Sequence, residues 1–407
     1  MLLTNKASFI IINTKNGAEK LGRRKFALAI IVIAVLLSTL FLVHEMSVRM
    51  NEYSTPKFFV GVEFAYNNVE NCKALVDRVK NFTNLFVVGS LETTLDESNL
   101  NEVCDYVYDA GLYFFVFFIS PMNETMYYRY NYYPHIWILE AKEKYGDRFL
   151  GTYAFDEPGG KQLDQGSFKM VIAEDAKDYA EASEVYVENL YAHIEYYTYL
   201  RIYEDYRVLT ADYGLYWFDY KAGYDTVLAE FGWNHSRQLH VALCRGAARV
   251  QNKDWGVIVT WTYNGPPYIE SGDELYNDMI LAYHAGAKYV VVFNYPKIVR
   301  YGILTPEHFD AIKKFWNYIH TSPENHGIEG ELAYVLPKDY GFGFRNPNDT
   351  IWGLWKADES SKKIWDDVNN LLDRYGSRLD IVYSDPEFNN AIKNRYNELI
   401  FWNETAP

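Results

Sequence analysis

Two adjacent carboxylates, Asp156 and Glu157, lie between an apolar run and a Pro-Gly-Gly turn in the stretch FLGTYAFDEPGG, residues 149–160. Two acids held close together can divide acid–base work, because one can hold a proton while the other stays ionised. Adjacent acids at the end of a strand are, however, often only solvated turn residues or the cap of the next helix. Whether this pair can do chemistry therefore depends on which other residues the fold brings to it.

Apolar runs rich in β-branched and aromatic residues alternate with helical patterns through the middle of the chain. Runs that are apolar throughout are typical of parallel strands covered on both faces. The runs are residues 58–64, 84–90, 112–119, 149–155, 206–214, 226–233, 255–263 and 288–296. The helical patterns between them include residues 71–82, 100–111, 135–146, 236–253 and 274–287.

Eight strand–helix units over about 260 residues predict an α/β fold, the (β/α)8 TIM barrel. The alternative is a doubly wound open sheet. It is less favoured because no glycine-rich phosphate loop follows any of the early runs.

A TIM barrel places its active site at the carboxyl ends of its strands, so the polar residues there are the candidates for chemistry. Acids dominate these positions, and aromatic residues accompany them. The predicted strand ends carry Glu63, Tyr153, Asp156, Glu157, Asp212, Tyr213, Glu230, Trp261, Tyr263, Asn264, Asn294 and Tyr295. Few basic residues lie at the same ends, so simple ion pairing does not account for the acids.

Acids beside flat aromatic rings are the composition that hydrolysis of a glycosidic bond requires. One carboxyl protonates the leaving oxygen, another attacks or stabilises the sugar cation, and the rings hold sugar faces. We therefore predict catalysis by Glu157, Asp156 and Glu230, with Glu157 as general acid/base. The predicted substrate-binding residues are Glu63, Tyr153, Asp212, Tyr213, Trp261, Tyr263, Asn264 and Asn294. We expect an oligo- or polysaccharide substrate and no metal or cofactor.

The separation of the carboxyls would decide the mechanism. Glu230 at about 5 to 5.5 Å from Glu157 or Asp156 would complete a retaining site, which is our expectation, whereas about 6.5 to 9.5 Å would admit an attacking water and imply inversion. If Glu230 is remote, Asp156 could instead hold an acetamido group of the substrate.

The run YAFDEPGG resembles the strand-four acid motif of (β/α)8 glycoside hydrolases, in which an acidic residue followed by proline ends the strand. The commonest version has Asn where this chain has Asp156, and the seventh predicted strand has no glutamate. The Asp-Glu pair is similar to the N-acetylhexosaminidase families, which implies Glu157 as acid/base and Asp156 as the residue that orients an acetamido group. Glu230 on strand six resembles barrel α-glycosidases. Residues 57–385 as a whole resemble membrane-anchored or secreted archaeal glycosidase-like proteins.

Residues 26–43, FALAIIVIAVLLSTLFLV, carry no charge and follow Gly-Arg-Arg-Lys. The run is long enough to span a bilayer, and its basic flank predicts a cytoplasmic N-terminus with the rest of the chain outside. A cleaved signal peptide is less favoured, because the run exceeds the usual apolar length of about 7 to 15 residues and no small-x-small site follows closely. We therefore expect a single-pass protein of the cell membrane, in contact with the lipid bilayer through residues 26–43.

The pattern changes after Ser322. A strand at residues 331–336, an amphipathic helix around Ile364 and Val368, and a strand at residues 379–385 predict a small β-α-β module, too short to fold alone, that packs on the barrel. The aromatic residues of its loop, residues 338–355, are either core or the wall of a ligand groove. The predicted parts are a tail (1–25), an anchor (26–43), a linker (44–56), the barrel (57–322), the module (323–390) and a tail (391–407).

Several function classes are disfavoured. The formal net charge of −15 opposes binding to nucleic acid. The first predicted strand has no His-x-His for a metal-dependent hydrolase, and the chain has no Gly-x-Ser-x-Gly elbow. Cys72, Cys104 and Cys244 lack metal-ligand spacing and are expected to be buried free thiols. A non-catalytic glycan-binding surface protein remains the alternative to a hydrolase.

Overall fold

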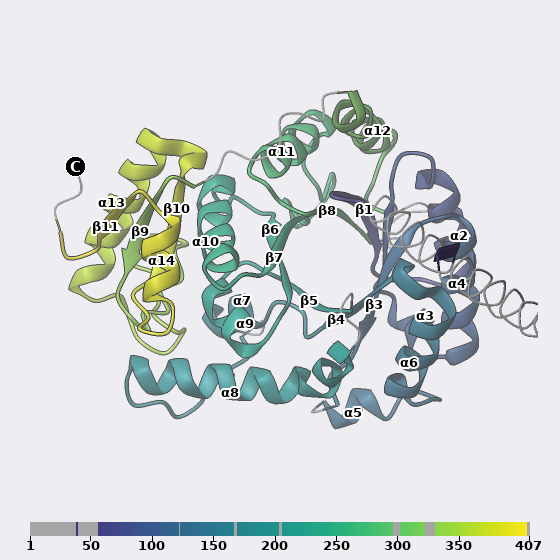
Figure 1. Ribbon diagram of the computed structural model, residues 1–407, viewed down its shortest axis with the longest axis horizontal. Helices are drawn as coiled ribbons and strands as arrows, with labels where there is room; N and C mark the ends of the chain where they lie inside the picture. The colour runs from purple at the N-terminus through teal and green to yellow at the C-terminus, as the bar shows by residue number, and fades with distance from the viewer. Residues whose placement is uncertain are drawn as a thin grey trace, which may run out of the picture. The chain divides into compact units, whose positions relative to one another are not determined.

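Eight parallel strands pair in chain order, and β8 returns to β1, so that the sheet closes into a barrel (Figure 1). The strands are β1 (Phe59–Phe64), β2 (Leu85–Val88), β3 (Tyr113–Phe118), β4 (Phe149–Ala154), β5 (Arg207–Asp212), β6 (Thr226–Phe231), β7 (Asp254–Val259) and β8 (Tyr289–Asn294). Each strand overlaps its predicted run, and nearly every strand residue is buried. The prediction of a TIM barrel is confirmed.

The computed structural model describes residues 38–39, 56–121, 123–166, 169–202, 206–295, 302–321 and 330–404. Of the predicted anchor, only Ser38 and Thr39 belong to these residues; the rest of the anchor and the predicted tail before it lie outside them. Within the described ranges, no helix is both long enough and apolar enough to cross a bilayer.

Helices cover the outside of the barrel (Figure 1). Several begin at a polar residue whose side chain accepts a backbone N–H of the first turn, as Asn68, Asp96 and Ser236 do. The helices are α2 (Val69–Val79), α3 (Leu91–Thr94), α4 (Glu97–Asp109), α5 (Glu124–Tyr127), α6 (Pro134–Tyr145), α7 (Pro158–Leu163), α8 (Tyr179–Thr198), α9 (Tyr216–Ala222), α10 (Arg237–Val250), α11 (Gly272–His284) and α12 (Pro306–Thr321). The short 3-10 helices η1 (Gly146–Arg148), η3 (Tyr199–Ile202) and η4 (Gly376–Arg378) also occur.

The inside of the barrel is filled by an apolar cluster that is separate from the larger core of the molecule. In it the rings of Phe59 and Tyr289 stack with their centroids 5.1 Å apart. Alternate residues of a strand share one face, so the residues at i, i+2 and i+4 point into the barrel together. Glu63 therefore follows Phe59 along the inner face of β1, and Glu230 follows Leu228 along the inner face of β6. This alternation brings two acids to the carboxyl end of the barrel, next to its apolar filling.

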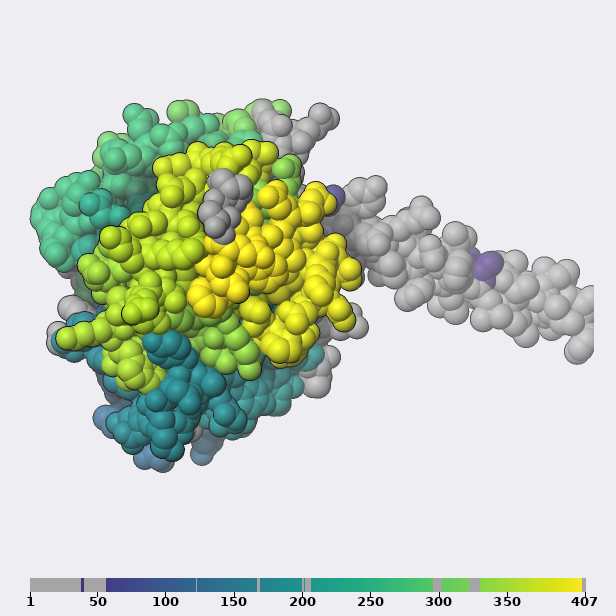
Figure 2. Space-filling view, turned by 90° about the vertical axis from the view of Figure 1, so that its left-hand side faces the viewer, coloured from purple at the N-terminus to yellow at the C-terminus, as the bar shows by residue number. Residues whose placement is uncertain are grey.

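The C-terminal module is a three-stranded parallel sheet in the order β10-β9-β11. Its elements are β9 (Leu332–Leu336), α13 (Glu359–Tyr375), β10 (Leu379–Tyr383), α14 (Asn389–Arg395) and β11 (Glu398–Phe401). The predicted β-α-β unit is present, and β11 adds a third strand where only a tail was expected. Figure 2 shows the module as a continuous yellow-green layer over this side of the molecule.

The module belongs to the same compact unit as the barrel, Phe58–Pro407. It packs against α10 through a buried ion pair, in which Arg245 Nε lies 2.7 Å from Asp380 Oδ1. In its loop, Trp352 is fully buried, and its ring lies 4.6 Å from that of Phe218 on α9. Trp352 is thus core between module and barrel rather than the wall of a groove. The three cysteines are free and buried, as expected.

Candidate active site

A cavity of about 830 Å³ opens at the carboxyl end of the barrel. Most of the predicted site residues line it, although they come from five different strands or the loops that follow them. Those that line it are Glu63, Tyr153, Asp156, Glu157, Tyr213, Glu230, Trp261, Tyr263 and Asn264. The structure thus brings these predicted residues together around one cavity.

The turn after β4 explains how two adjacent acids face the same cavity. Phe155 and Glu157 both adopt left-handed backbone conformations, with φ of 54° and 55°. Such angles are uncommon for residues other than glycine and reverse the strand alternation that would send Asp156 and Glu157 to opposite faces. The Glu157 N–H donates to the carbonyl of Ala211 at 3.0 Å, which fixes the turn to β5. The sequence placed this turn at Pro158, whereas the turn begins before it.

Lys161, in the last turn of α7, is a cation that lies beside both acids. Its Nζ lies 3.1 Å from Glu157 Oε2 and 3.3 Å from Asp156 Oδ2, and it donates to the Asp156 carbonyl at 2.8 Å. Burial lowers the pKa of Lys161, but the two neighbouring carboxylates outweigh it, so the pKa lies above its ordinary value. Tyr153 donates its hydroxyl to the other carboxylate oxygen of Asp156. Both oxygens of Asp156 are therefore engaged.

The carboxyls of Glu157 and Glu230 both line the cavity, and each shifts the pKa of the other. Burial raises the pKa of Glu230 well above its ordinary value, and the charges of Glu157 and Asp156 raise it further. Burial and then Asp156 also raise the pKa of Glu157, whereas Lys161 lowers it. Glu230 is therefore the better proton donor of the two, and the Lys161 charge favours the ionised form of Glu157.

Glu63, at 7% exposed, is a second buried carboxyl in the wall of the cavity besides Glu230. Burial raises its pKa to about 8, with smaller contributions from Asp156 and Glu157. A Cβ on Gly89 of the β2–α3 connection would approach Glu63 Oε1 to 2.5 Å, so only glycine leaves room for this side chain. At pH 7 this carboxyl is therefore mostly neutral.

Two predicted substrate-binding residues, Asp212 and Asn294, do not line the cavity. Asp212 is fully buried, and its oxygens accept the backbone N–H groups of Gly159 at 2.5 Å and Gly160 at 2.7 Å. Asn294 is 1% exposed and packs against Gly302. Both residues end barrel strands as predicted, but Asp212 binds backbone groups of the protein, and the buried side-chain amide of Asn294 has no hydrogen-bond partner among the described residues.

Other lining residues were not predicted. Trp233 and His235 follow Glu230 in the stretch EFGWNHS, so a longer reading of that strand end would have included them. Arg345 comes from the C-terminal loop, and no pattern near it points to the barrel. The residues that sequence reasoning missed include Tyr66, Asp164, Trp233, His235, Tyr268 and Arg345. Within the described part of the chain, no group of three or more His, Cys, Asp or Glu side chains is arranged to hold a metal ion.

Aromatic rings surround the acids. The Trp261 ring packs between two tyrosine rings, with centroid distances of 5.9 Å to Tyr268 and 5.6 Å to Tyr295. The ring centroids of Tyr295 and Tyr66 lie 4.6 Å apart. Trp233 and Tyr263 are 39% and 45% exposed at the rim. The cavity thus combines carboxyls at its floor with open ring faces at its entrance.

Comparison with known proteins finds no matching family model and no matching curated protein. Solved structures match in fold. The β-galactosidase of the psychrophilic Marinomonas ef1 is 11% identical, with 84% of this chain and 75% of that chain covered, at a TM-score of 0.53. GH5_18 from Streptomyces cattleya, in complex with GlcNAc, is 10% identical, with 86% of this chain and 99% of that chain covered, at a TM-score of 0.54. The β-galactosidase of the Antarctic haloarchaeon Halorubrum lacusprofundi is 11% identical, with 84% of this chain and 69% of that chain covered, at a TM-score of 0.54. The barrel therefore shares the fold of glycoside hydrolases.

Proposed function

We propose that this protein is a glycoside hydrolase that cleaves an oligo- or polysaccharide by carboxylate catalysis. The observation that carries the proposal is the pair of Glu157 and Glu230 in one aromatic-rimmed cavity, where Lys161 lies 3.1 Å from Glu157 and burial raises the pKa of Glu230. A proton donor beside an ionised carboxylate is what cleavage of a glycosidic bond requires. The shared fold with β-galactosidases supports the same conclusion.

The electrostatics of the pair support a division of roles that differs from the expectation from sequence. Lys161 favours the ionised form of Glu157, which suits a nucleophile, whereas Glu230 holds a proton for the leaving oxygen. In the first step Glu157 bonds to the anomeric carbon while Glu230 protonates the departing oxygen; in the second, Glu230 deprotonates a water that releases the sugar.

The strong mutual effect of the two carboxyls on their pKa values favours retention of the anomeric configuration. It suits the shorter carboxyl spacing of retaining enzymes, about 5 to 5.5 Å, better than the 6.5 to 9.5 Å or so that accommodates an attacking water. A substrate-assisted route through Asp156 is less supported, because Tyr153 and Lys161 already engage both of its carboxylate oxygens.

The roles can be tested with the full-length protein on aryl glycosides and polysaccharides, with and without N-acetyl groups. We expect the wild type to release products of retained configuration, as read by proton NMR. Azide should rescue Glu157→Ala to give a glycosyl azide of inverted configuration, and should rescue Glu230→Ala to give one of retained configuration. Glu102→Ala, on the outside of the barrel, is the control and should behave as wild type.

The opposite pattern of rescue would exchange the two roles. Full activity in Glu157→Ala and Glu230→Ala, or binding of glycans by the wild type with no turnover, would contradict the proposal.

We also propose that residues 26–43 anchor the protein in the cell membrane with the barrel outside. The uncharged run and its basic flank in the sequence support this orientation. Protease added to intact cells should then remove the barrel, and protection of the barrel would contradict the orientation.

A further inference from the structure

Helix α7 carries Lys161 and directly follows Glu157, yet it has only six residues, Pro158–Leu163. A helix this short gains little stability from its own hydrogen bonds, so its position depends on its surroundings. What holds α7 in place therefore also sets the position of the proposed catalytic groups.

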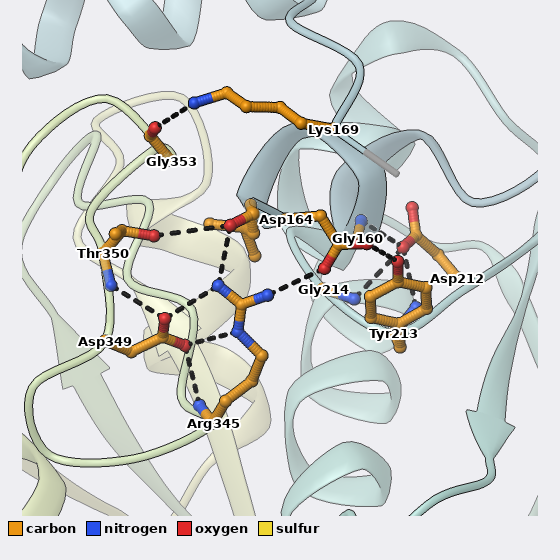
Figure 3. A network of polar contacts seen from close by, with 11 residues as sticks. Gly160, Asp164, Lys169, Asp212, Tyr213, Gly214, Arg345, Asp349, Thr350 and Gly353 are labelled. Carbon is orange, nitrogen blue, oxygen red and sulfur yellow. Dashed lines mark hydrogen bonds and ion pairs between the residues drawn. The ribbon is translucent and has the colours of Figure 1, made fainter. Parts of the chain in front are cut away.

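The N-terminal end of α7 is held by Asp212 at the end of β5. Its Oδ2 accepts the Gly159 N–H at 2.5 Å, and its Oδ1 accepts the Gly160 N–H at 2.7 Å. The same Oδ1 accepts the N–H groups of Tyr213 and Gly214. A buried carboxylate thus joins the turn after β4 to the turn after β5 (Figure 3).

The C-terminal end of α7 is held by Arg345 of the C-terminal module. Its Nη2 donates to the Leu163 carbonyl at 2.7 Å, and its Nη1 pairs with Asp164 Oδ1 at 2.9 Å. On its other side the guanidinium donates two hydrogen bonds of 2.8 Å, from Nε and Nη2, to the carboxylate of Asp349 (Figure 3). Asp164 Oδ2 accepts the Tyr213 hydroxyl at 2.8 Å, so the two ends of the clamp share a partner.

Close packing on two sides completes the enclosure of α7. A Cβ at Gly160 would overlap the ring of Tyr213, and a Cβ at Gly353, whose φ is +62°, would overlap the Gln162 carbonyl. Gln162 in turn donates its side-chain amide to the Trp352 carbonyl at 2.6 Å. The helix thus packs directly on the Tyr213 ring at Gly160, and its backbone meets the backbone of the module at Gly353.

We propose that Asp212 and Arg345 are positioning residues that clamp α7, and that the C-terminal module is thereby a working part of the active site. The proposal deepens the proposed function and rests on it for its effect on turnover. Neither residue needs to touch the reacting atoms. Asp212 lies outside the cavity lining, and the Nε, Nη1 and Nη2 groups of Arg345 all donate to the protein.

The test compares Asp212→Asn and Arg345→Met in the full-length protein with matched controls. Asp225→Asn removes an aspartate that accepts the Val208 N–H at the opposite end of β5. Arg378→Met removes an arginine of the same module whose partner is Glu331, away from α7. Displacing a catalytic group by about 1 Å can cost on the order of 100-fold in rate. We expect kcat to fall by roughly that factor in the two clamp variants with KM nearly unchanged, and to stay within about threefold of wild type in the controls.

Hydrogen exchange provides a second measurement that does not depend on activity. Exchange in residues 155–164 should rise in both clamp variants, while exchange in β1 and β8 stays at the wild-type level. If a clamp variant does not fold, Lys169→Met removes only a bond to the Gly353 carbonyl and should cause a smaller rise in the same segment.

Unchanged exchange in residues 155–164, or kcat within about threefold of wild type in the clamp variants, would overturn the clamp. A raised KM at unchanged kcat would also overturn it, because direct binding of substrate by Arg345 predicts that result. If the wild type cleaves no glycan, the proposed function fails, whereas a local rise in exchange still supports the clamp.

Discussion

Glu230 and Glu157 line the same cavity at the carboxyl end of the barrel and shift each other's pKa, although Glu230 lies on β6, Glu157 follows β4, and the two are 73 positions apart in the sequence. This arrangement requires the inward alternation of β6 and the left-handed conformation of Glu157 at the same time. Two acids that interact so strongly do not both ionise near neutral pH, so they share one proton. This shared proton is the source of the acid catalysis that we propose.

The first prediction concerns how the pair titrates. Glu157→Gln removes a negative charge that raises the pKa of Glu230, so the pKa of Glu230 should fall. Carbon-13 NMR titration of labelled glutamate side chains measures the change, with Glu102→Gln as the control. An unchanged or higher pKa for Glu230 would mean that the two carboxyls do not interact.

Lys161→Met should move the acid limb of the pH–rate profile to higher pH. The Lys161 charge lowers the pKa of Glu157, and without it Glu157 must reach a higher pH to ionise as a nucleophile. We expect the lower apparent pKa of kcat/KM to rise by about one pH unit or more. Lys177→Met, at an 85% exposed lysine, should leave the profile unchanged. A fall in that apparent pKa would rule out this role for Lys161.

Glu63→Gln should stabilise the protein at alkaline pH. Burial raises the pKa of Glu63 from 4.5 to about 8, so the folded protein binds a proton that the unfolded chain releases between these values. The stability from Glu63 is complete below pH 4.5 and is lost as pH rises through about 8, at ~1.4 kcal/mol per pH unit. A neutral glutamine avoids this loss. The free energy of unfolding of the variant, relative to wild type, should rise from pH 5 to pH 8 in denaturant titrations, and a flat difference would contradict the raised pKa.

Much of the fold could be predicted because its signals are local. An unbroken apolar run marks each barrel strand in the sequence. The residues at the carboxyl ends of parallel strands must then lie at the same end of the barrel. Glu63 and Glu230 were found by this rule. The strand β11 was missed because it is four residues long and begins with the exposed Glu398, which leaves too short an apolar pattern to detect.

The rest of the site depends on contacts between distant parts of the chain. Asp212 ends a barrel strand, as a substrate-binding residue would. Its carboxylate oxygens nevertheless accept hydrogen bonds from the backbone of Gly159 and Gly160, more than fifty positions earlier in the sequence. Arg345 reaches the cavity only because Trp352 and Gly353 seat the C-terminal loop against α7 and α9. Such contacts depend on how the module docks, which no periodicity in the sequence encodes.

The rim of the cavity leads to the last prediction. Trp233 follows β6, lines the cavity and is 39% exposed. Its backbone N–H donates a hydrogen bond to the Trp261 carbonyl at 2.6 Å, which holds this part of the loop in place. An exposed indole gains contact area when a sugar face covers it, and aromatic contacts of this kind contribute about 0.5 to 1.5 kcal/mol, or roughly 2- to 10-fold in affinity.

Trp233→Ala should therefore raise KM by roughly 2- to 10-fold and leave kcat and the free energy of unfolding close to wild type. Steady-state kinetics on a cleaved glycan and denaturant titration measure the three quantities. The control is Tyr128→Ala, which removes a 78% exposed ring outside the cavity lining and should change none of them. A loss of kcat at constant KM would instead place Trp233 among the groups that act in the transition state, and an unchanged KM would remove it from the substrate-binding surface.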